Sequence, residues 1–284
     1  MHTSKAMVFL FGILSVQGAL SASAQELPFM PPVPDHAWTR REQGELRYLI
    51  PPTELVSLLS AAGTSLAAVQ TARLFFYDSC DSALLRAGIY LSARTPESGD
   101  STLWVRMRPF DSTQSDSRWV GTHGFSCSWQ WVANRMAPSC VLERQVGVRV
   151  LNSAESGESS LGDLFSEDQR SFMTLYAPQL IAWENLVSAG PINSYRWEAQ
   201  RDFLTGPLAI ELWRLPTTME EVLTVSTRAR LEDLPQVKAR TLFWLQQQGL
   251  HPVEDDSTRL RLAVQRQLSQ EINCTMGRPW ETYP

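Results

Sequence analysis

The sequence predicts an α+β protein whose centre is an antiparallel β-barrel, flanked by helices. The first observation behind this prediction is a series of about nine short strand-like segments, bounded by turn residues. The second is that most connections between these segments are short, which favours antiparallel neighbours. The third is that only a few helical patterns interrupt the series, and no internal repeat is present in the sequence.

The composition is that of a globular, acidic protein. The chain has 284 residues, of which 43% are hydrophobic and 19% are charged, so it can build one sizeable core. Only Lys5 and Lys238 are lysines among its 25 basic residues, yet the net charge is −5. A chain of this charge is a poor general binder of nucleic acid, and we expect no nucleic-acid partner. The arginines can serve binding only where they gather locally.

The N-terminus has the pattern of a cleaved secretory signal. Lys5 precedes an apolar run, and the small residues Ser21–Ala24 precede Gln25. A transmembrane anchor is the alternative, but the apolar run is shorter than the roughly 20 residues that a span needs. We therefore expect residues 1–24 to be a signal peptide and the mature protein to be exported, periplasmic or extracellular, with no membrane span.

The rest of the chain divides into a proline-rich linker at 25–40, a barrel domain at 41–250 and a C-terminal helical tail at 251–284. Helices are predicted where proline or a capping box begins an amphipathic pattern, at 54–63, 166–176, 233–248 and 258–272. Strands are predicted at 45–50, 72–77, 88–93, 102–108, on both sides of 133–134, and at 145–151, 195–197, 208–215 and 222–227.

The four cysteines predict one specific disulfide. Cys127 and Cys140 each lie six residues from the predicted turn at Ala133-Asn134. A hairpin there would set them opposite each other at a non-hydrogen-bonded pair, where the Cα atoms are about 4.5 Å apart and a bridge fits. Two reduced, buried thiols are the alternative, and export favours the disulfide. Cys80 and Cys274 are left over, and the spacings match no zinc site.

Charged residues recur at two-residue spacing on the predicted strands. Arg106 and Arg108 share one face of their strand, and Glu45 shares a face with Arg47. If these faces line the inside of a barrel, the arginines need an anion, because a buried charge without a partner is costly. If the faces point outward, the arginines are ordinary solvated side chains. Alternation alone leaves both possibilities open.

The segments Phe76–Arg94 and Thr102–Arg108 resemble the CYTH domain of the triphosphate tunnel metalloenzymes. Softer similarity at Trp183–Ile192, Glu211–Trp213 and Leu223–Ser226 extends the resemblance over about 41–250. The resemblance implies a tunnel barrel in which basic side chains hold a triphosphate. It also implies glutamates that hold Mg²⁺ or Mn²⁺, which would polarise the phosphoryl group for attack by water.

Transferred position by position, the resemblance implies ligand-binding roles for Arg47, Arg86, Arg94, Arg106 and Arg108. It leaves only Glu45 and Glu211 as metal ligands, because Gln43 and Thr224 stand where the family has glutamates. Ser128 and Gln130 likewise stand on a strand where acidic residues are expected. Hard divalent cations prefer several oxygen ligands that include carboxylates, so the implied Mg²⁺ or Mn²⁺ site is weakened.

The sequence therefore predicts an exported CYTH-like protein that binds a phosphate-rich anion, such as triphosphate or polyphosphate, with little or no catalysis. Arginine suits this role because its planar guanidinium binds phosphate oxygens in pairs and keeps its proton. The alternative is a metal-dependent triphosphatase or polyphosphate hydrolase. A structural barrel whose arginines pair with the acidic residues of the chain is a third possibility.

Overall fold

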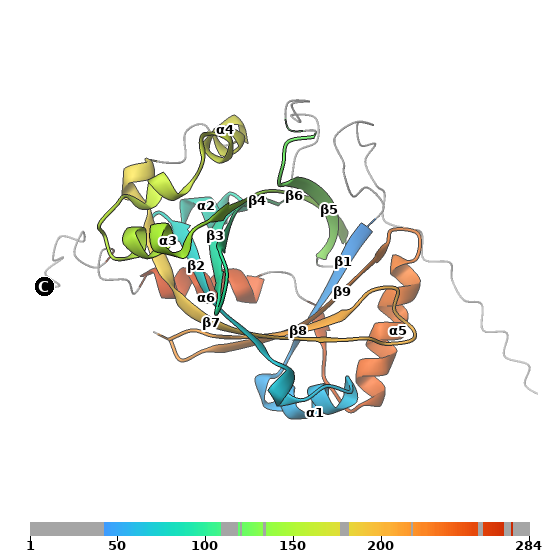
Figure 1. Cartoon of the computed structure of the whole chain (residues 1–284). Helices are drawn as coiled ribbons and strands as arrows, with labels where there is room; N and C mark the ends of the chain where they lie inside the picture. The colour runs from blue at the N-terminus through green and yellow to red at the C-terminus, as the bar shows by residue number, and fades with distance from the viewer. Residues whose placement is uncertain are drawn as a thin grey trace, which may run out of the picture.

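The computed structural model describes residues 43–108, 119, 121–132, 135–176, 182–216, 218–254, 258–269 and 274. The predicted signal peptide and the predicted linker lie outside these residues. Nine strands close into a barrel around a central space (Figure 1). The predicted fold class, a barrel with flanking helices, is confirmed.

The strands follow one another around the barrel in the order β1-β5-β6-β4-β3-β2-β7-β8-β9, and β9 pairs back onto β1. Every pairing in this ring is antiparallel except the short one between β1 and β5, which is parallel. The two-residue strand β10 also pairs with β1. The strands are β1 (Gln43–Ile50), β2 (Gln70–Asp78), β3 (Ile89–Pro96), β4 (Ser101–Met107), β5 (Phe125–Val132), β6 (Arg135–Val146), β7 (Val187–Ala199), β8 (Leu208–Arg214), β9 (Glu221–Arg230) and β10 (Val253–Glu254).

The helices lie around the outside of the barrel and across one of its ends. They are α1 (Leu55–Ala61), α2 (Ala83–Arg86), α3 (Val148–Glu155), α4 (Glu167–Tyr176), α5 (Leu234–Gln247) and α6 (Thr258–Ser269). The prediction of a strand over 145–151 is wrong in its second half. β6 ends at Val146, and α3 buries Leu151 and Ala154, whose spacing of three is helical. No helix in the described part of the chain is long and apolar enough to cross a membrane.

Alternation along the strands separates an apolar outer face from a polar inner face. One outer core lies between β2–β6 and the helices α3 and α4, with Leu91, Leu103 and Phe172 among its members. A second outer core lies between β1, β7–β9 and the helices α1 and α5. Since the helices cover the outer faces, the polar side chains of the same strands point into the barrel.

At one end, the barrel interior is apolar and α6 fills it. Ala263, Val264 and Leu268 of α6 are buried against interior side chains of β1, β2, β7 and β9. In Figure 1, α6 lies across the ring of strands beside β2 and β7. The interior side chains that meet α6 are Leu49, Leu74, Phe76, Ile192 and Val222. The helix therefore closes one end of the tunnel.

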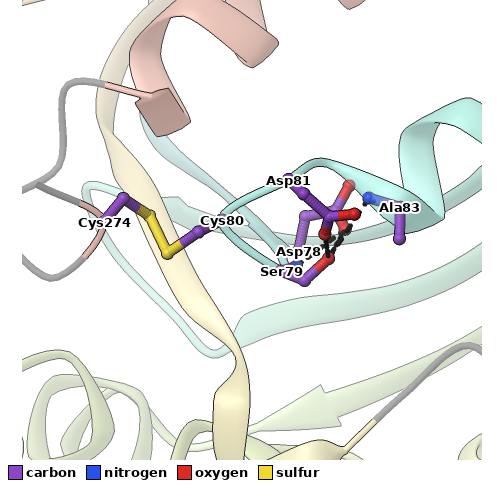
Figure 2. Close-up of a disulfide and its surroundings, with 6 residues drawn as sticks. All are labelled: Asp78, Ser79, Cys80, Asp81, Ala83 and Cys274. Carbon is purple, nitrogen blue, oxygen red and sulfur yellow. Dashed lines mark hydrogen bonds between the residues drawn. A yellow bond between two sulfur atoms is a disulfide. The ribbon is translucent and has the colours of Figure 1, made fainter. Parts of the chain in front are cut away.

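Two disulfides cross-link the described part of the chain, one within a hairpin and one between distant segments. Cys127 and Cys140 lie directly opposite each other in the β5–β6 pairing, with their Cα atoms 4.1 Å apart. Cys80 and Cys274 are joined across 194 residues (Figure 2). The second bridge ties the chain beyond α6 to the loop between β2 and α2. An ion pair of 3.0 Å between Arg266 and Glu220 ties α6 itself to the β8–β9 turn.

Candidate anion-binding tunnel

The inner faces of the strands enclose a cavity of about 640 Å³. Its wall carries seven arginines and three glutamates, so positive charge is in excess. Six of the residues that the sequence predicts for the site lie here together: Glu45, Arg47, Arg94, Arg106, Arg108 and Glu211. The remaining charged residues of the wall are Arg196, Glu198, Arg228 and Arg230.

Arg86, the other arginine predicted for the tunnel, lies outside it. It is the last residue of α2, and its guanidinium forms a 2.7 Å ion pair with Asp81. The side chain is 55% exposed. The placement of Arg86 in the tunnel rested on the resemblance alone and not on strand alternation, and the structure contradicts it.

Arg196, Arg228 and Arg230 were missed by the sequence analysis. Arg228 and Arg230 continue the alternation of β9, but the predicted strand ended at Thr227, three residues before β9 ends. Arg196 lay within a predicted strand, as one isolated arginine between two aromatic residues. The two-residue spacing at 228 and 230 was therefore the signal that could have identified two of the three.

Glu45 is paired with two arginines of the wall. Its Oε1 accepts a 2.7 Å hydrogen bond from Arg47, and its Oε2 lies 3.6 Å from Nε of Arg228. Burial alone would raise the pKa of Glu45, but the charges of Arg47, Arg228 and Arg106 outweigh burial and lower the pKa to about 2. Glu45 is therefore ionised at neutral pH and is already neutralised by two arginines.

Arg106 stands beside this group without a partner of its own. Within the described part of the chain, it forms no hydrogen bond and no ion pair. Burial lowers its pKa, and the attraction of Glu45 is opposed by repulsion from Arg47, Arg108 and Arg228. A guanidinium does not lose its proton in proteins, so this charge stays, and among the described residues only Glu45, already paired with Arg47 and Arg228, offsets it.

The other predicted residues are held in part by neighbours. Nη1 of Arg94 lies 3.9 Å from Glu211, which also accepts a 2.8 Å hydrogen bond from Ser194. Arg108 donates a hydrogen bond to the side-chain carbonyl of Gln130 and lies over the ring of Tyr90. These contacts fix the direction of both guanidinium groups into the cavity.

Glu45 and Glu211, the two predicted metal ligands, do not form one divalent metal site. Glu45 lies opposite Arg228 on β9, whereas Glu211 lies opposite Thr224. Arg228 and Thr224 are four residues apart along β9, or about 13 Å, so Glu45 and Glu211 cannot hold one ion between them. No group of three or more His, Cys, Asp or Glu side chains suited to a metal occurs among the described residues. The predicted pair of ligands therefore does not fit Mg²⁺ or Mn²⁺.

No protein-family model matches the sequence, and no curated protein matches it. Solved structures with a similar fold include a Hippeastrum protein, described as a candidate adenylyl cyclase with a dominant triphosphatase activity. It is 14% identical, the match covers 82% of this chain and 98% of that chain, and the TM-score is 0.55. A candidate adenylate cyclase from Bacillus halodurans is 13% identical, with coverage of 77% and 98% and a TM-score of 0.52.

At these identities the comparisons establish the fold and not the chemistry. Both matches cover nearly the whole length of the other protein, so the barrel is shared as a complete unit. The resemblance that the sequence carries is therefore confirmed at the level of architecture: this chain has a closed barrel with the same fold as these two solved structures.

Proposed function

We propose that the protein binds a phosphate-rich polyanion, such as triphosphate or polyphosphate, in the arginine-lined tunnel, with little or no hydrolysis. The observation that carries this proposal is the guanidinium of Arg106, which has no hydrogen bond or ion pair among the described residues. Arg47, Arg108 and Arg228 act on it with like charge, and Glu45 opposes them. A bound polyanion would offset the repulsion among these arginines.

The shape and donors of the cavity support a ligand of this kind. Its volume of about 640 Å³ lies in the range of small-molecule sites, about 300–1,000 Å³. Arginine binds phosphate through paired, charge-assisted hydrogen bonds, which are stronger than neutral ones. A multiply charged, oxygen-rich ligand would therefore meet matching donors on several strands at once.

The alternative is a metal-dependent triphosphatase, favoured by the fold it shares with the Hippeastrum protein. Such an enzyme would use Mg²⁺ or Mn²⁺ to withdraw charge from the phosphoryl group. Against it, both oxygens of Glu45 are engaged by arginines, and Glu211 lies at a different level of the barrel. Binding without turnover is the function that the geometry supports best.

The test is calorimetric titration of the purified protein with tripolyphosphate, first in EDTA and then in Mg²⁺ or Mn²⁺, with phosphate release followed in the same samples. Binding in EDTA without release supports the proposal. Absence of binding under all three conditions overturns it. Turnover that requires the added metal would establish the triphosphatase instead.

A pair of arginine variants locates the binding site. Arg106→Gln should weaken tripolyphosphate binding about 10- to 100-fold, because hydrogen bonds to charged groups contribute about 1.5–3 kcal/mol. Arg86→Gln is the matched control, since the same substitution on the exposed residue of α2 leaves the tunnel intact. Equal affinity of the Arg106 variant and the unaltered protein would exclude the tunnel as the binding site.

We also propose that the protein is exported. The signal pattern of residues 1–24 supports this, and so do the two disulfides, because disulfides persist mainly in oxidising compartments. Mass spectrometry of the protein made in its own cell should find a mature N-terminus at Gln25. An intact N-terminus on protein retained in the cytoplasm would contradict export.

A further inference from the structure

A second, smaller cavity of about 50 Å³ opens beside the tunnel, between β1, β4, β5 and β6. Glu45, Arg106 and Gln130 line both cavities, so the smaller one is a side pocket of the tunnel. Its own wall is rich in hydroxyl groups, those of Ser126, Ser128 and Ser139.

The strand register explains why these groups meet. Ser128 and Ser139 face each other directly across the β5–β6 pairing. Ser126 lies opposite Val141, which in turn lies opposite Arg106 on β4. The hydroxyls and the guanidinium therefore occupy neighbouring positions on the inner surface of three adjacent strands.

The hydroxyl donors of the side pocket are unused. Among the residues that the structure describes, Ser126, Ser128 and Ser139 form no side-chain hydrogen bond. Ser139 is buried, whereas Ser126 and Ser128 are half-buried. The three hydroxyls are therefore free to donate to a molecule that enters the pocket.

We propose that the side pocket receives the terminal phosphoryl group of the bound polyanion, held by the serine hydroxyls and Arg106. This inference rests on the proposed function and deepens it, because it assigns to hydroxyls the place that a metal ion cannot take here. Three hydroxyls and a guanidinium offer hydrogen-bond donors from several directions, as a tetrahedral oxyanion requires. The carboxylate of Glu45 does not repel the guest strongly, because Arg47 and Arg228 neutralise it.

The size and charge of the side pocket favour a small anionic group. Its volume of about 50 Å³ is far below the 640 Å³ of the tunnel, so it has room for a small group and not for a nucleoside. A cation would face Arg106, which Arg47, Arg108 and Arg228 already repel. The guest is therefore small and anionic, as the end of a polyphosphate is.

The test uses the double variant Ser128→Ala/Ser139→Ala and calorimetry with tripolyphosphate in EDTA. Loss of two hydroxyl donors to a charged group should weaken binding at least about tenfold. Ser57→Ala/Ser60→Ala, on the exposed side of α1, is the matched control and should bind as the unaltered protein does. Thermal melting monitored by circular dichroism checks that each variant is folded.

A second variant keeps the proposal testable if the double variant fails to fold. Ser139→Thr keeps the hydroxyl and adds one methyl group to the small cavity, so it should also weaken binding by excluding the guest. If the unaltered protein binds tripolyphosphate and the serine variants bind equally well, the side pocket is excluded while the proposed function stands. If the unaltered protein does not bind, both fail.

Discussion

At the scale of single residues, the tunnel depends on an unequal division of charge between Glu45 and the arginines around it. Glu45 is paired twice, whereas Arg106 lacks a partner in the described part of the chain. In the absence of a ligand, Glu45 stabilises the fold by offsetting repulsion among arginines on β1, β4 and β9. Its contribution depends on its being ionised.

Glu45→Gln tests this contribution through pH. The carboxyl has a pKa of about 2 in the folded protein and 4.5 as its ordinary value, so its stabilisation is complete above pH 4.5 and is lost as the pH falls toward 2. The unaltered protein should exceed the variant in free energy of unfolding by about 3 kcal/mol at pH 6, and the difference should nearly vanish at pH 2. Urea unfolding at both pH values measures it, and a constant difference would contradict the pairing.

Sequence reasoning at this scale succeeded where alternation was visible and failed where it was not. The two-residue spacing correctly predicted that Arg106 and Arg108 share one face of their strand and that Glu45 shares a face with Arg47, while the inner placement of these faces came from the resemblance. Alternation along one strand does not tell which inner side chains of different strands lie close together. The distance between Glu45 and Glu211 depends on the stagger of β1, β9 and β8, which only the folded barrel defines.

At the scale of elements, a row of three neighbouring side chains crosses β9, β1 and β5 at a place where carboxylates could bind a metal. Glu45 lies between Arg228 on one side and Gln130 on the other. Facing side chains of paired strands have Cβ atoms about 4.5–5.5 Å apart, close enough to share one ion. Only the middle position of this row carries a carboxylate.

Gln130→Glu combined with Arg228→Glu should therefore create Mn²⁺ binding, which calorimetry would detect. Three carboxylates would then lie side by side on adjacent strands, the donor set that hard cations prefer. Gln43→Glu with Thr224→Glu also adds two carboxylates, but Gln43 lies opposite Arg230, six residues or about 20 Å from Thr224. In that control Thr224→Glu faces only Glu211, so no row of three carboxylates forms and Mn²⁺ should bind more weakly than in the first variant. Equal affinity in both variants would contradict the prediction.

The hairpin β5–β6 was predictable because its sequence carries local signals on both strands, and the element that follows it was not. Residues 145–151 look like a strand because Val146, Val148 and Val150 alternate. From Val148 onward the chain is helical in spite of this alternation, because α3 buries Leu151 and Ala154 against the outer face of the barrel. Local alternation is thus a weaker guide where a helix can cover an exposed apolar surface.

At the scale of the whole molecule, the two disulfides constrain very different lengths of chain. Their sequence separations are 13 and 194 residues. In the chain-entropy account, opening the shorter loop costs about 3 kcal/mol and opening the longer one about 5 kcal/mol. Cys80→Ala/Cys274→Ala should therefore lower the free energy of unfolding more than Cys127→Ala/Cys140→Ala, as measured by urea titration. The reverse order would show that strain or residual structure dominates.

The position of α6 also determines what kind of molecule the barrel can accept. Because the helix fills the apolar end of the interior, the arginine-lined space is closed at that end in the part of the chain that the structure describes. A long linear polyphosphate cannot pass through it and can only insert a tip. The amount of protein that a polyphosphate solution binds should then rise with the number of chain termini. At a fixed number of termini it should not depend on chain length.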